Sequence, residues 1–234
     1  MRLTSMNRRT LPGKVFAVAL ALLPAASISV ARAQLSAPPN TANTFRDTSM
    51  IKPPAGAKVA IYDFEDLECP ACSHAFPIVL SAVERYHIPL VRHDFPLKMH
   101  IWSFDAAVTA RYIQDKISPQ AAEEFRGAVF QNQTAIASKD DLQAFTQKYF
   151  QSHGREVPFV MDPSGLFTQE VKSDYTLGER IGLTQTPTIF VVTPKNWIQV
   201  TDINYLYQTI DAAIAQTGAS TSTAATTRPT ARHK

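Results

Sequence analysis

Cysteine is nearly absent from this sequence. Its 234 residues hold two cysteines, Cys69 and Cys72, separated by one Pro-Ala dipeptide in the stretch "IYDFEDLECPACSHAFP". A disulfide across so short a ring constrains the unfolded chain little, so the pair is a weak device for stability. A structural zinc site needs about four ligands, but the sequence has no second cysteine pair, and His74 is expected on a different face of the helix. We therefore predict that the pair carries chemistry.

An excess of basic residues is also missing once the first 33 residues are set aside. That segment holds five of the 23 Lys and Arg residues and no acid, which leaves 18 basic and 20 acidic residues in the other 201. The resulting net charge of −2 offers no basic surface, so no nucleic-acid partner is predicted. A chain of this length can bury a full core as one domain, with room for an inserted subdomain.

Near its start the sequence has an apolar run, "VFAVALALLPAASISV", that is too short and interrupted to span a bilayer stably. Basic residues precede this run and "ARA" follows it at residues 31–33, which predicts a cleaved signal peptide over residues 1–33 and Gln34 as the first mature residue. An uncleaved anchor is the alternative. "RRT" raises twin-arginine export, although its surroundings match that signal poorly. The predicted location is periplasmic or otherwise extracytoplasmic, where disulfides persist.

The chain that follows predicts a strand-helix-strand unit. Residues 34–57 are rich in Pro, Ala, Asn and Thr and are interpreted as an N-terminal arm. "KVAIYDF" has the nearly continuous apolar run of a buried strand, and "IPLVRHDF" is a second strand candidate. A helix is predicted from Pro70, which suits a first helical turn, with a kink at Pro77. This order predicts parallel strands joined by a right-handed crossover within residues 58–102.

Helical periodicity dominates residues 103–181 and predicts four helices, which are interrupted at Ser118-Pro119, Ser138, Gly154 and Asp162-Pro163. The strand pattern returns in residues 182–217, where "TPTIFVV" and "WIQV" are joined by the hairpin turn "TPKN" and followed by a last helix. Residues 218–234 are polar and of low complexity, which predicts a disordered tail. The expected fold class is α/β with an inserted helical subdomain.

The cysteine pair lies where the first predicted helix begins. The thiolate is the form that attacks disulfides, and the free N–H groups and dipole of a helix N-terminus stabilise it at Cys69. Cys72 follows on the same face and is close enough to resolve a mixed disulfide. Two cysteines at this spacing after a strand form the thioredoxin-like redox motif.

Acidic residues surround the pair. The negative charges of Glu65, Asp66 and Glu68 disfavour a thiolate nearby. We expect them to be solvated loop charges. The alternative is that they tune the reduction potential of the cysteine pair or repel some partners. Asp63 lies near the end of the apolar strand. A carboxyl partly buried there would have a raised pKa and could relay the proton of Cys72. The alternative is a strand-end carboxylate that faces water.

The sequence resembles a known family. "VAIYDFEDLECPACS" together with "TQTPTIFVV" is similar to the DsbA-like branch of the thioredoxin superfamily, from about residue 45 to residue 217. The resemblance implies a thioredoxin-like fold with the helical insertion described above. It implies that Cys69 is the nucleophile, that Cys72 resolves the mixed disulfide, and that Asp63 is a buried proton relay.

The resemblance also implies a substrate-binding site at Thr186 and Pro187, with Pro187 preceded by a cis peptide bond opposite the cysteines. The sequence departs from the family in the active-site loop of Pro70 and Ala71, because the best-known oxidase has a histidine where Ala71 stands. Without that histidine Cys69 should be less acidic and the disulfide less oxidising. His100 stands where relatives often have a histidine, and we expect a packed or surface side chain without an assigned role.

These observations predict an extracytoplasmic thiol–disulfide oxidoreductase that introduces disulfides into exported proteins. Its partners would be cysteine-containing exported proteins and a membrane or soluble protein that reoxidises or reduces it. The redox-active Cys69–Cys72 disulfide is the only redox group predicted, with no metal, flavin or haem. A reductase or isomerase is the closest alternative, but residues 34–58 look too short for an isomerase dimerisation domain, which favours a monomer. A metal carrier or thiol-dependent holdase is the non-catalytic alternative.

Overall fold

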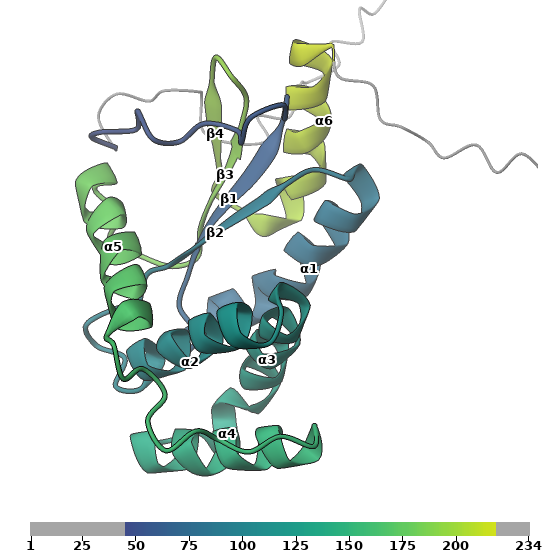
Figure 1. The fold of residues 1–234 in the computed structure, drawn as a ribbon. Coiled ribbons are helices and arrows are strands. Elements are labelled where there is room, and N and C mark those ends of the chain that lie inside the picture. Colours follow the sequence, from purple (N-terminus) through teal and green to yellow (C-terminus); the bar gives the residue numbers. More distant parts are fainter. Residues whose placement is uncertain (1–44, 219–234) are drawn as a thin grey trace, which may run out of the picture. The chain divides into compact units, whose positions relative to one another are not determined.

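The computed structural model describes residues 45–218, and a mixed sheet lies at its centre (Figure 1). Within these residues the sheet has four strands in the order β2-β1-β3-β4: β1 Ala60–Glu65, β2 Leu90–Asp94, β3 Thr188–Val192 and β4 Trp197–Val200. Strand β1 pairs parallel with β2 and antiparallel with β3, and β3 pairs antiparallel with β4. The predicted parallel unit and the predicted C-terminal hairpin are both confirmed.

The helices of residues 45–218 are α1 Pro70–Tyr86, α2 Ser103–Lys116, α3 Pro119–Asn132, α4 Lys139–Ser152, α5 Leu166–Ile181 and α6 Leu206–Thr217, with short 3-10 turns at Gln133–Ala135 and Ile203–Tyr205. The four helices predicted between residues 103 and 181 are confirmed. Ser118 and Ser138 begin two of them, because each hydroxyl accepts a hydrogen bond from a backbone N–H of the first turn. Helix α1 runs through Pro77 to Tyr86, so the proline does not end it.

Helices cover both faces of the sheet (Figure 1). Helices α1 and α6 pack on one face in a cluster that includes Ile61, Val79, Ile189 and Ile210. The other face is covered by the end of α5 and by the segment before β1, in a cluster of Phe64, Phe190, Ile181, Trp197 and Ile51 with Phe45. Successive strand residues point to opposite faces, so β1 supplies side chains to both clusters.

A second core lies among α2, α3 and α4, with Trp102, Ile113, Phe125 and Phe150 buried in it. This cluster also contains Cys69 and Cys72, so the cysteine pair lies where α1 meets the helical region. Helix α5 connects the regions: Phe167 and Val171 near its start pack on α2, while Ile181 at its end packs on the sheet.

Several predictions fall outside the described residues. These are the signal peptide of residues 1–33, cleavage before Gln34, the first part of the N-terminal arm and the tail after Gly218. The described part of the arm packs on the fold, because the ring of Phe45 lies 5.1 Å from that of Phe190 and Ile51 is buried. Within residues 45–218 the structure contains no helix with the length and apolar character needed to cross a membrane.

Candidate active site

Cys69 caps the N-terminus of α1. Its backbone is extended, Pro70 occupies the first turn, and the helix follows directly. Proline has no N–H to leave unpaired and its fixed φ suits this position. The free N–H groups of the first turn, those of Ala71 and Cys72, act on the Cys69 sulfur. The local sequence therefore places the Cys69 sulfur at the N-terminus of α1, the positive end of the helix dipole.

The two thiols differ strongly in acidity. A hydrogen bond from the Cys72 thiol, together with Thr186 and the first-turn N–H groups, outweighs partial burial and lowers the pKa of Cys69 to about 5. Burial, and then the hydrogen bond to Cys69, raises the pKa of Cys72 well above its usual value. Cys69 is 7% exposed and Cys72 only 2%, and neither is in a disulfide in this structure. At neutral pH one sulfur is a thiolate that can attack, and the other holds its proton.

The loop before β3 brings Thr186 and Pro187 to the cysteines. Thr188 is the register partner of Phe64, so the residues before β3 lie at the end of β1 that leads to Cys69. The Thr186–Pro187 peptide bond is cis, and the Cys69 thiol lies 3.3 Å from the Thr186 carbonyl oxygen. Thr186 is 8% exposed, and its side chain also acts on the Cys69 sulfur.

A groove of about 500 Å³ opens beside this loop. Its walls come from α1, from the loop before β3 and from the end of β4, and they include Ala71, His74, Gln185, Pro187 and Asp202. His74, which the sequence placed on another helical face from the cysteines, is exposed there. The groove therefore adjoins the contact between the nucleophilic sulfur and the Thr186 carbonyl.

Asp63 is buried under α1. It is 2% exposed, and its Oδ1 has no hydrogen-bond partner in the described chain. Because it alternates with Ile61, its side chain points to the face that α1 covers. Burial, and then the charge of Glu65, raises the pKa of Asp63 to about 8 despite the opposing charges of Arg92 and Arg126. Its charge in turn raises the pKa of Cys72. A protonated carboxyl at neutral pH thus lies within electrostatic reach of the resolving thiol.

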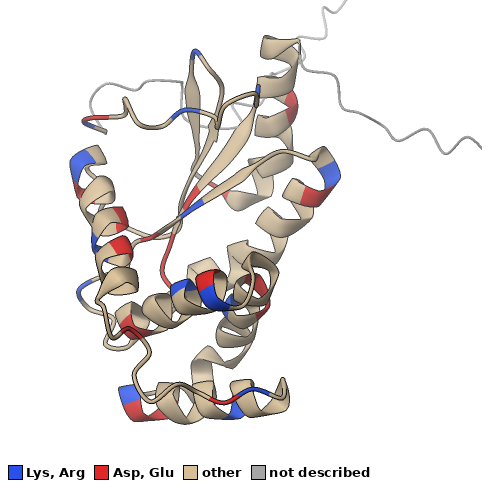
Figure 2. Cartoon of the chain, in the orientation of Figure 1, with Lys and Arg blue, Asp and Glu red and all other residues tan. Residues whose placement is uncertain are grey.

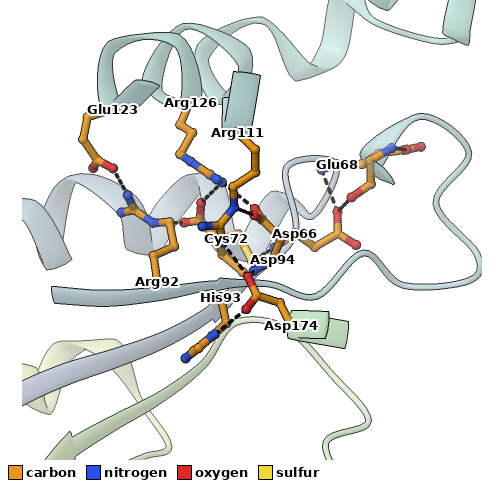
Figure 3. A network of polar contacts seen from close by, with 12 residues as sticks. Asp66, Glu68, Cys72, Arg92, His93, Asp94, Arg111, Glu123, Arg126 and Asp174 are labelled. Atoms are coloured by element: carbon orange, nitrogen blue, oxygen red, sulfur yellow. Dashed lines mark hydrogen bonds and ion pairs between the residues drawn. The ribbon is translucent and has the colours of Figure 1, made fainter. Parts of the chain in front are cut away.

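Charged side chains of the two neighbouring strands and of α2 and α3 form a network (Figure 3). Arg126 of α3 is 1% exposed and donates to Glu65 at 2.7 Å and to Asp94 at 2.8 Å. Arg111 of α2 donates to Asp94 at 2.6 Å. Burial alone would raise the pKa of Asp94, but Arg126 and Arg111 lower it to about 2. Figure 2 shows acidic residues where β1 and β2 end, in addition to those on the helices.

The network continues across the edge of the sheet. Arg111 also donates to Asp174 of α5 at 2.5 Å, and Nδ1 of His93 lies 2.7 Å from the same carboxylate. Arg92, the register partner of Asp63, pairs with Glu65 at 3.1 Å and with Glu123. Apart from Glu65, sequence reasoning missed these residues. Their partners lie on other elements, and no local pattern marks them.

The expectation that Glu65, Asp66 and Glu68 are solvated loop charges is wrong. Glu65 ends β1 and is 2% exposed against Arg126, and Asp66 is 1% exposed. Glu68 is half-buried, and its Oε2 accepts hydrogen bonds from the N–H groups of Trp102 and Ser103 at 2.7 and 3.0 Å. It thereby caps the N-terminus of α2. The partners of all three lie far along the chain, which is why the acidic cluster looked like a loop.

Asp66 ties the active-site segment to the loop after β2. Its carboxylate accepts hydrogen bonds from the N–H of Leu97 at 2.6 Å, from Nδ1 of His100 at 2.7 Å and from the Ser103 hydroxyl. The Asp66 N–H in turn lies 3.4 Å from the Cys72 sulfur. The sequence assigned His100 no role, and the structure places it against the carboxylate of a residue that contacts the resolving cysteine.

Among residues 45–218, no three His, Cys, Asp or Glu side chains are grouped so that they could hold a metal ion. The site instead consists of two unequal thiols, a buried carboxyl and a backbone carbonyl beside a groove. A thiolate at a helix N-terminus next to a protonated second thiol can perform thiol–disulfide exchange.

Comparison with known proteins agrees with this geometry. The family model described as Thioredoxin matches residues 47–212. No curated protein matches the chain. Among solved structures, DsbA2 of Pseudomonas aeruginosa is similar with a TM-score of 0.52 and 20% identity, over 69% of this chain and 91% of that one.

Two further structures have the same architecture. ScsC of Proteus mirabilis in a transitional conformation is similar with a TM-score of 0.54 and 17% identity, over 70% of this chain and 71% of that one. A periplasmic thioredoxin-like protein from Salmonella enterica serovar Typhimurium is similar with a TM-score of 0.53 and 19% identity, over 69% of this chain and 87% of that one. At these identities the likeness establishes a shared fold.

Proposed function

The chain belongs to the thioredoxin family and is a thiol–disulfide oxidoreductase of DsbA-like fold, and from that premise we propose that it is an extracytoplasmic oxidase that introduces disulfides into exported proteins. The observation that carries the proposal is the place of Cys69 at the N-terminus of α1, where the Cys72 thiol and the first-turn N–H groups lower its pKa to about 5. A stabilised thiolate favours the reduced form of the protein, which makes its disulfide a stronger oxidant.

In the proposed reaction a client thiolate attacks the Cys69 sulfur of the Cys69–Cys72 disulfide. The S–S bond breaks, and Cys72 leaves with the electron pair. The client's second thiolate then attacks the mixed disulfide, and Cys69 leaves as the thiolate. The client is oxidised by two electrons and the protein is reduced to the dithiol. Cys69 departs readily because thiols of low pKa are good leaving groups.

Cys72 needs a proton when it leaves, because its pKa lies well above the usual value. Asp63 is the group proposed to supply it. With a pKa of about 8 its carboxyl is protonated at neutral pH, and proton transfer by a positioned side chain lowers the barrier of such a step. The reverse transfer occurs when the dithiol is reoxidised by an external acceptor.

The groove beside Pro187 is proposed to receive the client chain. The Thr186 carbonyl already lies against the reacting sulfur, and the main chain of a client offers N–H donors to such an acceptor. The predicted signal peptide, and the shared fold with a periplasmic thioredoxin-like protein of Salmonella enterica, support an extracytoplasmic site of action.

The reduction potential against glutathione tests the direction of the chemistry. We expect a value of about −120 to −180 mV at pH 7. A value of about −250 mV or below would overturn the oxidase proposal and favour a reductase. Cys69→Ser, which cannot form the disulfide, is the blank for the assay.

The pH dependence of that potential tests the unequal thiols. Between pH 5 and the high pKa of Cys72, reduction takes up one proton for two electrons. The potential should therefore fall by about 30 mV per pH unit, and by about 60 mV per unit below pH 5, where both thiols are protonated. Ultraviolet absorbance of the thiolate should titrate in the same range. A single slope of about 60 mV per unit up to pH 8 would contradict the acidic Cys69.

A further inference from the structure

A second cavity lies between the loop after β2 and helix α5, and it shares no lining residue with the groove beside Pro187. Its volume is about 460 Å³. Pro96, Leu97, Phe104 and Tyr175 give it a mainly apolar wall. A cavity of this size can take one or two apolar side chains.

The loop that forms one wall also exposes large apolar side chains. Met99 is 76% exposed and Ile101 is 56% exposed. Neither lines the cavity itself, so the apolar surface extends beyond the cavity along the loop. Single exposed apolar residues are ordinary, but two within three residues beside an apolar cavity form a patch of the kind that contacts partners. Methionine adapts readily to different partner shapes.

This loop is fastened next to the cysteines. Asp66 accepts hydrogen bonds from Leu97 and His100. At the other end of the loop, Glu68 accepts them from Trp102 and Ser103. Asp66 and Glu68 belong to the segment that leads directly into Cys69. Both ends of the loop are thus held against that segment, so a molecule bound on the loop lies next to the segment that leads into Cys69.

The charge at the cavity has one sign. Lys98 and Lys172 line it, and no acidic side chain of the described chain does. Both lysines are exposed, and neither has an ion-pair partner within residues 45–218, whereas Lys116 and Lys139 are paired with aspartates. Two unpaired ammonium groups around an apolar cavity favour an occupant with both negative charge and apolar side chains.

We propose that this surface, made of the cavity together with Met99 and Ile101, docks an acidic, apolar segment of the protein that exchanges its disulfide at Cys69. The proposal rests on the proposed function, because it names a partner of the same reaction. A peptide segment fits better than a small amphiphile, because the apolar surface continues outside the cavity along the loop. Docking there would hold the partner's cysteine near Cys69 while its charges meet Lys98 and Lys172.

Synthetic peptides test this directly. Each has one cysteine, a spacer of three to six Gly and Ser residues, and Leu-Glu-Leu-Glu; the spacers reach about 10 to 21 Å. Matched peptides carry Lys in place of Glu. The measured quantity is the second-order rate at which each peptide reduces the Cys69–Cys72 disulfide, divided by the rate for the neutral thiol 2-mercaptoethanol.

We expect the best acidic peptide to react about tenfold faster than its basic match at low ionic strength, with the ratio falling as salt is added. The double variant Lys98→Glu/Lys172→Glu should bring the ratio to one or invert it. The double variant Lys58→Glu/Lys195→Glu makes the same change of charge at two exposed positions, just before β1 and in the β3–β4 turn, at the far end of the sheet from Cys69. It should leave the ratio as in the unaltered protein.

The outcomes separate the two proposals. If the disulfide does not react with 2-mercaptoethanol or glutathione, the proposed function fails. If it reacts but the acidic and basic peptides are equal, or the double variant keeps the original ratio, the docking proposal fails alone. Binding of decanoate that depends on Lys98 and Lys172, without any discrimination between peptides, would also overturn it, since the occupant would then be a small amphiphile.

Discussion

One face of the sheet has two ends that are equally buried and chemically opposite. At one end Val59, Ile61 and Val191 pack in a cluster with apolar side chains of α1 and α6. At the other end, Asp63 and Glu65 continue the same side of β1, and both are 2% exposed. There α3 and α2 supply Arg126 and Arg111, which pair with the buried carboxylates of Glu65 and Asp94.

The difference lies in how each end is stabilised. Burial of apolar surface contributes roughly 25 cal/mol per Å² without needing a specific partner. A buried carboxylate costs several kcal/mol in lost hydration, and only a well-placed partner offsets this. At the apolar end, stability therefore falls in proportion to the apolar surface that a substitution removes. At the ionic end, the loss of any one charged side chain leaves a buried partner without its counter-charge. The ionic end is also the one that adjoins Cys72, so its charges act on the reaction as well as on stability.

Replacing Arg126 by methionine should have the largest effect. It leaves Glu65 and Asp94 buried without their shared partner, so we expect a loss of about 4 kcal/mol of unfolding free energy, measured by urea denaturation. Arg180→Met removes an exposed pair with Asp47 at 2.7 Å and should change stability by no resolvable amount. Equal losses for both variants would show that the ionic end is not special.

Ile61→Ala probes the apolar end and comes next. Ile61 is fully buried, so we expect a loss of about 3 kcal/mol through lost burial and a residual cavity. The thiolate titration of Cys69 should keep its midpoint, because no charge or hydrogen bond at the site changes. A shift of that midpoint by one pH unit would contradict the separation of the two ends.

Asp63→Asn should change the pH dependence of stability. Since the pKa of Asp63 is raised from 3.8 to about 8 in the fold, the folded protein binds more protons than the unfolded chain between these values. Stability therefore falls as pH rises through this window, by up to about 1.4 kcal/mol per unit for one proton. Asparagine cannot titrate, so the variant's urea-denaturation profile should be flatter from pH 5 to pH 8. Asp140→Asn, at an exposed position of α4, should keep the original slope, and a parallel profile for Asp63→Asn would refute the raised pKa.

Ser103→Ala should have the smallest effect. It removes one donor to the buried Asp66 carboxylate while Leu97 and His100 remain. We expect a loss of about 1 kcal/mol in the same assay. Ser152→Ala removes an exposed hydroxyl that donates to a carbonyl of its own helix and serves as the control. No difference between the two would mean that water replaces the Ser103 hydroxyl at Asp66.

Much of the fold could be predicted from local patterns. The strand that ends at Glu65, the helix that starts at Pro70 and the later strand hairpin follow from apolar periodicity and from the placement of proline and serine. The Cys69 position followed in the same way, because a cysteine just before a helix start needs no distant partner to sit at the N-terminus. The roles of Asp66, Glu68 and His100 could not be predicted, since each depends on a residue about thirty positions away.

The sequence by itself determined where the redox pair lies, that its first sulfur meets a helix N-terminus, and which strands and helices form around it. These depend on residues within one or two turns of each other, whose spacing the chain fixes covalently. Only the tertiary structure decided that the acidic residues before Cys69 are buried and paired, that Asp63 points under α1, and that a cavity with two lysines opens between the loop after β2 and α5. The residues next to a carboxylate in the sequence are the same whether its side chain faces water or an arginine. Arg126 lies 61 positions from Glu65, so only the packing of α3 on the sheet decides that the Glu65 carboxylate meets this arginine and not water.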